Sequence, residues 1–402
     1  MVMRVFIASV FLLGSIVSFA QKQDNRITIG IADTVYSKIL NEKRVIYVHV
    51  PEGDKSKRYP VLYVLDGDDH FRSAVAITEQ ISGIIPEMVV VGIPNINRVH
   101  DFSPMHVNPD RLVDAGTAKQ TGGGENFMAF FEKELISYID AHYPTTNYRT
   151  LSGHSLGGLV VINAFFNHTA LFKSFIAIDP SLWWDDERWI KKYEAELPKH
   201  DFNGKALFVA IANNIPPGLD TLNIVTDTSY KAPITHAVLP FAHLVQKSTP
   251  QGLLFGSKFY PNEWHGSVEL NAEYDALRYI FKFYHFDFDY FRAHPHANAD
   301  SLLNVHFSNV SARMGYKVSP GEDMVNNMAY ASMGIHEMEV ASALFLRNVK
   351  DYPQSANAWD SLGEFYEAKG DTQKAIEAYT QSLSLKETED TRRKLNNLTG
   401  KK

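Results

Sequence analysis

Cysteine is missing from all 402 residues of this chain. The sequence therefore has no disulfide framework, no thiolate nucleophile and no cysteine-ligated metal, and an oxidising compartment would not harm the fold. Basic residues are in the minority, because 39 Lys and Arg stand against 46 Asp and Glu, which gives a net charge of −7. This balance, with no basic run, excludes nucleic acid and an anionic membrane surface as expected partners.

A long apolar run is also missing at the N-terminus. The apolar stretch 5–17 is shorter than the roughly 20 residues that a membrane span needs. Arg4 precedes it, Ser18-Phe19-Ala20 follows it as a small-x-small cleavage site, and no lipid-accepting cysteine comes after. We therefore predict that residues 1–20 form a signal peptide and that the mature chain, from Gln21, is periplasmic or secreted without a transmembrane anchor.

Eight β-rich apolar runs alternate with helical patterns over the first two thirds of the chain. Several of them, such as residues 88–93, are apolar on both faces, which is typical of strands covered by helices on both sides. We predict an α/β fold with a mostly parallel eight-stranded sheet, whose first two strands form an antiparallel edge. The expected strands are residues 27–31, 45–50, 61–65, 89–93, 149–152, 175–178, 206–211 and 256–260.

The segment 151–159 contains Gly-x-Ser-x-Gly between an apolar strand pattern and a helical pattern. A serine on such a sharp turn needs small neighbours, which Gly153 and Gly157 supply. The pattern predicts a nucleophile elbow with Ser155 as nucleophile; the alternative is an ordinary glycine-rich connection. A serine hydroxyl is a poor nucleophile at neutral pH, so a base, an acid and oxyanion donors must accompany it.

The chain order serine, acid, histidine of α/β-hydrolases predicts a base in the loop after the last strand. His265 lies there, and we predict it as the base. For the acid we predict Asp220, in the loop after the preceding strand, with Asp227, Glu263 or no acid at all as alternatives.

Backbone amides at two helix starts are the expected oxyanion donors. We predict the amide of Leu156 and one from Gly67 or Asp68, in the acidic turn after the third strand. Side-by-side carboxylates in such a turn favour helix capping over a metal site, so we expect neither a metal nor a cofactor.

Several segments together resemble one family. They are residues 60–67, 92–95 with Arg98, Asp101 and Pro104, the elbow 153–158, the segment 179–184 and the histidine loop 265–267. Over residues 59–285 the chain resembles the putative esterase family of α/β-hydrolases, which includes esterase D and the ferric-siderophore esterases. The resemblance implies the α/β-hydrolase fold and the roles of Ser155 and His265, whereas many relatives carry glycine and glutamate where this chain has Asn213 and Asn214.

Four residues are predicted to contact substrate: Arg98, His154, Trp183 and Trp184. The indole pair would stack on an aromatic acyl group, a catecholate or a sugar ring, or else close a pocket wall. Arg98 would contact substrate or form an ion pair with Asp101.

The last part of the chain has a 34-residue period typical of tetratricopeptide repeats. In its clearer second repeat, Trp359, Leu362, Gly363 and Tyr366 are followed by Ala375 and Tyr379 at the expected spacing. We predict an esterase domain over residues 21–285, a junction over 286–321 and a small all-α tetratricopeptide-like region over 322–402. The repeats would pack on the esterase body or bind a protein partner.

The function predicted is that of an exported serine carboxylesterase without cofactor, acting on a small-molecule or glycan ester such as a siderophore or an acylated carbohydrate. Acyl transfer through the same acyl-enzyme is the first alternative. A protein-binding module in which the repeats carry the main function is the second.

Overall fold

The computed structural model describes residues 27–53, 57–227, 229, 231–248, 250–294 and 298–400. The predicted signal peptide, residues 1–20, lies outside these described residues. Within them, no helix combines the length and the apolar character that crossing a membrane would require.

The body of the protein is built on one sheet of eight strands in the order β1-β2-β4-β3-β5-β6-β7-β8. Strands β3 to β8 run parallel, while β2 is antiparallel to both β1 and β4, which confirms the mostly parallel sheet with its antiparallel edge. The strands are β1 (Ile31–Ser37), β2 (Glu42–His49), β3 (Tyr59–Leu65), β4 (Val89–Ile93), β5 (Thr145–His154), β6 (Ser174–Ile178), β7 (Ala206–Ala212) and β8 (Leu254–Tyr260).

The first strand starts later than the sequence pattern predicts. Residues 27–30 are not in a strand, and β1 begins at Ile31. The hairpin with β2 sets this register, since Ser37 pairs with Glu42 across a tight turn and Ile31 pairs with Val48. The predicted strand over residues 27–31 rested on their apolar side chains, but Ile27 is 95% exposed and belongs to no core.

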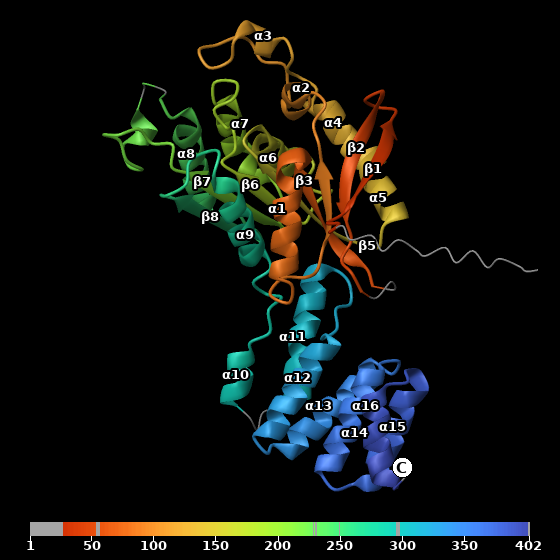
Figure 1. Cartoon of the computed structure of the whole chain (residues 1–402). Coiled ribbons are helices and arrows are strands. Elements are labelled where there is room, and N and C mark those ends of the chain that lie inside the picture. The colour runs from red at the N-terminus through yellow and green to blue at the C-terminus, as the bar shows by residue number, and fades with distance from the viewer. Residues whose placement is uncertain are drawn as a thin grey trace, which may run out of the picture.

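Helices cover both faces of the sheet (Figure 1). Helices α1 (Gly67–Gln80) and α9 (Val268–Ile280) pack on one face, whereas α6 (Leu156–Asn167) and α8 (Pro233–Ser248) are among those on the other. Strands β3, β4, β6 and β7 are consequently buried along their whole length. The remaining helical elements of this body are α2 (Arg98–Phe102), α3 (Ala115–Ala118), α4 (Gly124–Phe130), π-helix η1 (Phe131–Leu135), α5 (Ile136–His142), α7 (Arg188–Glu196) and the 3₁₀ turns η2 (Leu197–Lys199) and η3 (Ile224–Thr226).

The chain then continues into an all-helical region with its own apolar core. Helices α12 and α13 pack as a pair, as do α14 and α15, and α16 packs on α15. A small all-α C-terminal region is therefore present, and its tetratricopeptide character stays a prediction. The helices are α10 (Phe288–Ala293), α11 (Ala299–Met314), α12 (Glu322–Gly334), α13 (Met338–Asp351), α14 (Ala356–Ala368), α15 (Thr372–Leu385) and α16 (Glu389–Thr399).

Helix α11 joins the two cores. Its Val310 and Met314 belong to the apolar cluster on the α1/α9 face of the sheet, while its Leu303 and Phe307 belong to the core of the C-terminal helices. The predicted junction over residues 286–321 is thus mostly helical, and its longest helix packs on both parts of the molecule (Figure 1).

Candidate active site

The turn after β5 holds Ser155 in a strained conformation. Its φ of 60° and ψ of −118° lie outside the regions that most side chains adopt, and α6 begins at the next residue, Leu156. A Cβ atom at Gly153 would lie 2.5 Å from the carbonyl oxygen of Gly157, so this close approach requires glycine. Strand, turn and helix therefore present the Ser155 hydroxyl at the carboxyl edge of the sheet.

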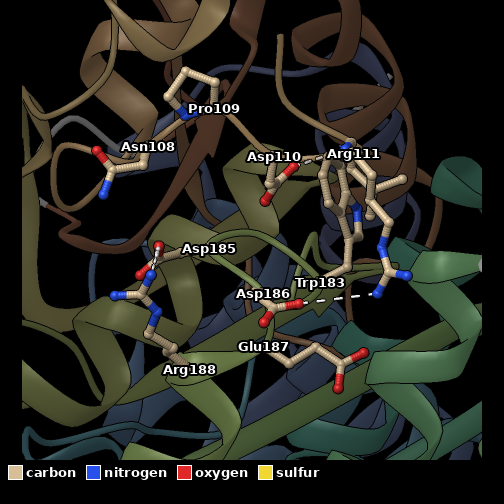
Figure 2. A pocket seen from close by; sticks show the side chains of 10 residues that line it. Asn108, Pro109, Asp110, Arg111, Trp183, Asp185, Asp186, Glu187 and Arg188 are labelled. Atoms are coloured by element: carbon tan, nitrogen blue, oxygen red, sulfur yellow. Dashed lines mark hydrogen bonds and ion pairs between the residues drawn. The ribbon is translucent and has the colours of Figure 1, made fainter. Parts of the chain in front are cut away.

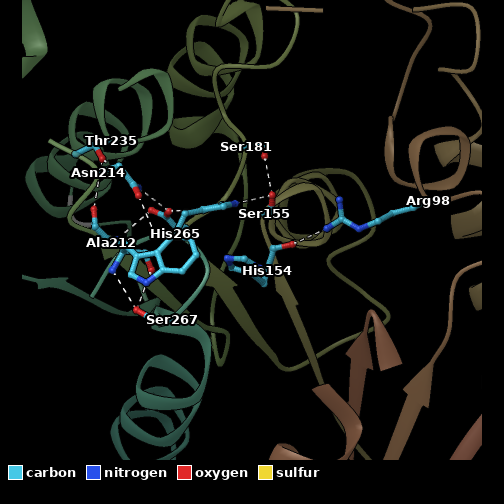
Figure 3. A network of polar contacts seen from close by, with 11 residues as sticks. Arg98, His154, Ser155, Ser181, Ala212, Asn214, Thr235, His265 and Ser267 are labelled. Atoms are coloured by element: carbon cyan, nitrogen blue, oxygen red, sulfur yellow. Dashed lines mark hydrogen bonds and ion pairs between the residues drawn. The ribbon is translucent and has the colours of Figure 1, made fainter. Parts of the chain in front are cut away.

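A histidine from the loop between β8 and α9 faces this hydroxyl. His265 Nε2 lies 3.0 Å from Ser155 Oγ, although the two residues are 110 positions apart in the chain (Figure 3). Ser181 Oγ lies 3.4 Å from the same hydroxyl. The two residues that the sequence singles out as nucleophile and base are thus within hydrogen-bond distance.

A buried carboxylate lies behind the imidazole. Asp179, the first residue after β6, places Oδ2 2.6 Å from His265 Nδ1, and its other oxygen accepts the Ala212 amide at 3.0 Å. Because a carboxylate only accepts hydrogen bonds, the His265 proton belongs on Nδ1. Nε2 then keeps a lone pair that can accept the Ser155 hydroxyl proton.

The predicted acid, Asp220, does not lie at this site. Its side chain is exposed and accepts the amides of Leu222 and Asn223 at 2.9 Å, so its oxygens are used within its own turn. The two alternatives also serve local structure. Asp227 accepts from Ser229, and Glu263 accepts from side chains of its own loop and of helix α9.

Asn214 supports the carboxylate that sequence reasoning missed. Its Nδ2 donates to Asp179 Oδ2 at 3.0 Å, and its Oδ1 accepts the His265 amide at 2.9 Å. The carboxylate that faces His265 lies at the end of β6 rather than in the predicted loop after β7. Both places are possible because these parallel neighbours end at the same edge of the sheet. An aspartate directly after an apolar strand, beside a loop with asparagine at the expected glutamate, is the signal that could have located it.

Two helix starts provide amide donors near the hydroxyl. The first amides of a helix have no acceptor within it, and Leu156 begins α6 while Gly67 and Asp68 begin α1. A Cβ atom at Gly157 would lie 3.3 Å from an Asp66 carboxylate oxygen, so the two helix starts adjoin. All three predicted oxyanion donors therefore lie at the edge of the sheet where Ser155 projects.

Arg98 braces the turn before α1. Its Nε and Nη2 donate to the two Asp66 carboxylate oxygens at 2.7 and 2.9 Å, and Nη2 also reaches the His154 carbonyl at 3.3 Å. The alternative ion pair with Asp101 does not form, since Asp101 pairs with the buried Arg44. Through these bonds to Asp66, Arg98 holds the turn that carries the predicted oxyanion donors.

His154 lies against the base rather than in a cavity. Its ring is 4.4 Å from the His265 ring, and its Nε2 is buried without a hydrogen-bond partner among the residues that the structure describes. Burial, followed by the nearby charges of His265 and His70, lowers the pKa of His154 to about 4. His154 is therefore neutral near pH 7, and its contact with substrate stays a prediction.

A cavity of about 250 Å³ opens between segments 108–112 and 183–188 (Figure 2). Trp183 lines it and is half-buried, whereas Trp184 is buried with its ring 5.3 Å away. Trp183 follows Ser181 by two residues, which span at most about 7 Å of chain. The indole of Trp183 therefore lines the cavity from the segment that follows Ser181, whereas Trp184 is not among the lining residues.

Carboxylates surround this cavity together with two arginines. Asp185 is buried, and its pKa is raised, first by burial and then by the charges of Asp110 and Asp186. Within the described part of the chain, no group of three histidine or acidic side chains is arranged to hold a metal ion.

A mostly parallel sheet with serine, histidine and aspartate meeting at its carboxyl edge defines an α/β-hydrolase with the geometry of the serine hydrolases. The sequence profile of the family described as "Putative esterase" matches residues 37–213. An IroE-like serine hydrolase from Shewanella oneidensis is 31% identical, with a TM-score of 0.65, and the match covers 78% of this chain and 97% of that one. The chain belongs to this esterase family.

Curated relatives are similar over a shorter region. Ferri-bacillibactin esterase BesA of Bacillus subtilis is 29% identical over 191 residues, which is 43% of this chain and 66% of the relative. The siderophore triacetylfusarinine C esterase of Aspergillus fumigatus is 29% identical over 31% of this chain and 45% of the relative. The chain therefore spans at most 66% of these two relatives.

The C-terminal helices also have a counterpart among solved structures. An uncharacterised protein from Capnocytophaga ochracea is 17% identical, with a TM-score of 0.60 over 92% of this chain and 99% of that one. At this identity the likeness concerns the fold alone, and it extends beyond the esterase body into the helical region.

Proposed function

We propose that this protein hydrolyses carboxylic esters through an acyl-serine intermediate, with Ser155 as nucleophile, His265 as base and Asp179 as acid. The observation that carries the proposal is the continuous chain of contacts from Asp179 through the imidazole to the Ser155 hydroxyl. Each part is oriented by a neighbour, as acyl transfer requires.

The reaction follows from the positions of the polar atoms. As Ser155 Oγ attacks the ester carbonyl, His265 Nε2 takes its proton, and the buried Asp179 carboxylate stabilises the imidazolium that forms. The Leu156 amide and an amide from Gly67 or Asp68 hold the developing oxyanion. His265 then protonates the leaving alcohol, and water attacks the acyl-enzyme with the imidazole again as base.

Siderophore esters are the substrate class that we propose. The names of the relatives support this class, since BesA is a ferri-bacillibactin esterase and the Aspergillus relative acts on triacetylfusarinine C. The cavity between segments 108–112 and 183–188 suits a ring-bearing ligand, because it offers the indole of Trp183 together with charged donors and acceptors. Export through residues 1–20 and a protein partner for the C-terminal helices complete the proposal, and both rest on the sequence patterns.

The direct test removes the nucleophile. Ser155→Ala should lower kcat for a chromogenic short-chain ester by about four to six orders of magnitude and abolish labelling by a fluorophosphonate, since the variant lacks the hydroxyl that forms the acyl-enzyme. Ser181→Ala is the matched control, because its hydroxyl lies 3.4 Å away but does not contact the imidazole. Persistent labelling of the Ser155 variant, or loss of labelling in the Ser181 variant alone, would contradict the assignment.

A further inference from the structure

Behind the catalytic imidazole lies a group of titratable side chains that the proposed reaction does not use. His70 belongs to the first turn of α1, Glu269 and Glu273 belong to α9, and His154 is the last residue of β5. His154, Glu269 and Glu273 each carry at least one buried polar atom without a hydrogen-bond partner among the described residues. This is unusual, because buried polar side chains in folded proteins normally have hydrogen-bond partners.

The group joins the three segments on which the reaction depends. His70 lies three residues after Gly67, in the helix whose start carries the predicted oxyanion donors, and Glu269 lies four residues after His265. The Nδ1 atom of His70 is 3.5 Å from Glu269 Oε2, so this contact links the start of α1 to the start of α9.

His154 lies between the two helix starts. Its ring is 4.4 Å from the ring of His265 and 5.9 Å, edge-on, from the ring of His70. A shift of His70 relative to Glu269 would therefore be passed to His154, and through it to the face of the catalytic imidazole. Because reactive groups lose efficiency when they are displaced by about 1 Å, such a shift would reduce turnover.

We propose that His70 and Glu269 are positioning residues for ester hydrolysis, which hold the oxyanion turn, the elbow and the histidine loop in register through their ion pair. The inference rests on the proposed serine mechanism. It assigns neither residue a contact with substrate.

The charges around His70 favour its protonated form. Glu269 from α9, Asp66 from the preceding turn and Asp69 from α1 raise the pKa of His70 against the opposing effect of its partial burial. His154 on β5 is neutral near pH 7, and His265 lies beyond it.

Glu273, one turn after Glu269 on α9, favours its protonated, uncharged form. Complete burial, and then the charge of Glu269, raises the pKa of Glu273 well above its ordinary value. A protonated Glu273 makes Glu269 the carboxylate that carries the negative charge of the pair, and Glu269 is the one that faces His70.

The ion pair between His70 and Glu269 depends on pH. Because the pKa of His70 is raised in the folded protein, the ion pair is complete at lower pH and is lost as the pH rises through that value. The reaction itself uses His265 as the base, and His70 is not part of that step. We therefore expect turnover to fall at high pH as His70 loses its proton.

The experiment compares kcat and KM over the pH range for the wild type, Glu269→Gln and His70→Lys with a neutral chromogenic ester. Glu269→Gln lacks the ion pair at every pH, so it should reduce kcat by about tenfold on the low-pH side of the wild-type fall and flatten the fall itself, with KM changed less than about twofold. His70→Lys keeps a positive charge to higher pH and should move the fall upward.

Asp275→Asn is the matched control on α9, because Asp275 pairs with Lys258 rather than His70, and it should leave the profile unchanged. A profile of Glu269→Gln that superimposes on the wild type would overturn the inference. It would leave the serine mechanism standing as long as turnover still requires Ser155, and turnover independent of Ser155 would refute that mechanism instead.

Discussion

Asp179 is the residue whose assignment most changes the chemistry of this site. Its two oxygens face three donors, the Ala212 amide, the Asn214 side-chain amide and the His265 Nδ1–H, so the site needs a group that only accepts. In Asp179→Asn the amide nitrogen would meet one of these donors. When it faces His265, it selects the tautomer with the proton on Nε2, which cannot take the proton of Ser155.

We therefore expect Asp179→Asn to lower kcat by about 10⁴-fold with little change in KM, because the geometry stays while the base is in the wrong tautomer. Asp220→Asn is the matched control and should keep nearly full activity, since Asp220 only accepts amides of its own turn. Steady-state kinetics on one ester decide the matter. Full activity of the Asp179 variant together with inactive Asp220→Asn would restore the acid predicted from chain order.

At this scale, the sequence predicts residues whose local pattern is sufficient and misses those defined by contacts across the sheet. The elbow motif singled out Ser155, and the loop after the last strand singled out His265, which the structure places 3.0 Å apart. Asp179 was missed because the rule of chain order names a loop, whereas the imidazole meets whichever carboxylate lies at the edge of the sheet. The contacts of Arg98 with Asp66 and of His154 with the His265 ring are likewise made across the sheet edge, and no local pattern in the sequence marks them.

Among the elements, the pairing of α14 with α15 depends on a glycine. A Cβ atom at Gly363 would lie 2.5 Å from the ring of Tyr379, which is fully buried between the helices. Tyr379 is also held by a hydrogen bond from its hydroxyl to Glu367 at 2.8 Å, so the ring cannot turn aside freely. Small residues at such contacts let paired helices approach closely.

Gly363→Val should destabilise the helical region by about 1–3 kcal/mol through overpacking, which thermal unfolding would detect. Gly334→Ala is the matched control, since a Cβ atom there meets no heavy atom within 4 Å, and it should be neutral or stabilise by about 0.5–1 kcal/mol. Ester turnover of the folded protein should stay unchanged in both. Equal melting temperatures would show that α14 and α15 are not packed as described.

The element pattern was the most predictable part of the fold. Runs that are buried on both faces, such as β3 and β4, need apolar residues at every position and so stand out in the sequence. Helix α11 was missed because its two apolar faces, one toward each core, blur the periodicity that marks an ordinary surface helix.

For the whole molecule, α11 decides how the esterase body depends on the C-terminal helices. Val310 and Met314 complete the apolar core on one face of the sheet, together with residues of α9 such as Leu277. The active site lies at the opposite end of the strands from this contact (Figure 1). The esterase body and the C-terminal helices are therefore joined through α11, while the active-site residues all belong to the esterase body.

Two truncations separate these contributions. A chain ending at residue 318 keeps α11 and its contact with the sheet, so it should retain kcat and KM for a neutral ester within about twofold. It exposes Leu303 and Phe307, which are buried in the full chain, and should therefore associate more readily.

A chain ending at residue 285 also loses Val310 and Met314, and each lost apolar side chain removes about 1.5–3 kcal/mol of burial from the sheet core. We expect it to unfold at a clearly lower temperature than the 318 variant, as measured by calorimetry at equal concentration. Equal stability of the two variants would mean that α11 contributes nothing to the esterase body, whereas loss of turnover in the 318 variant at unchanged stability would show that the C-terminal helices act on the active site itself.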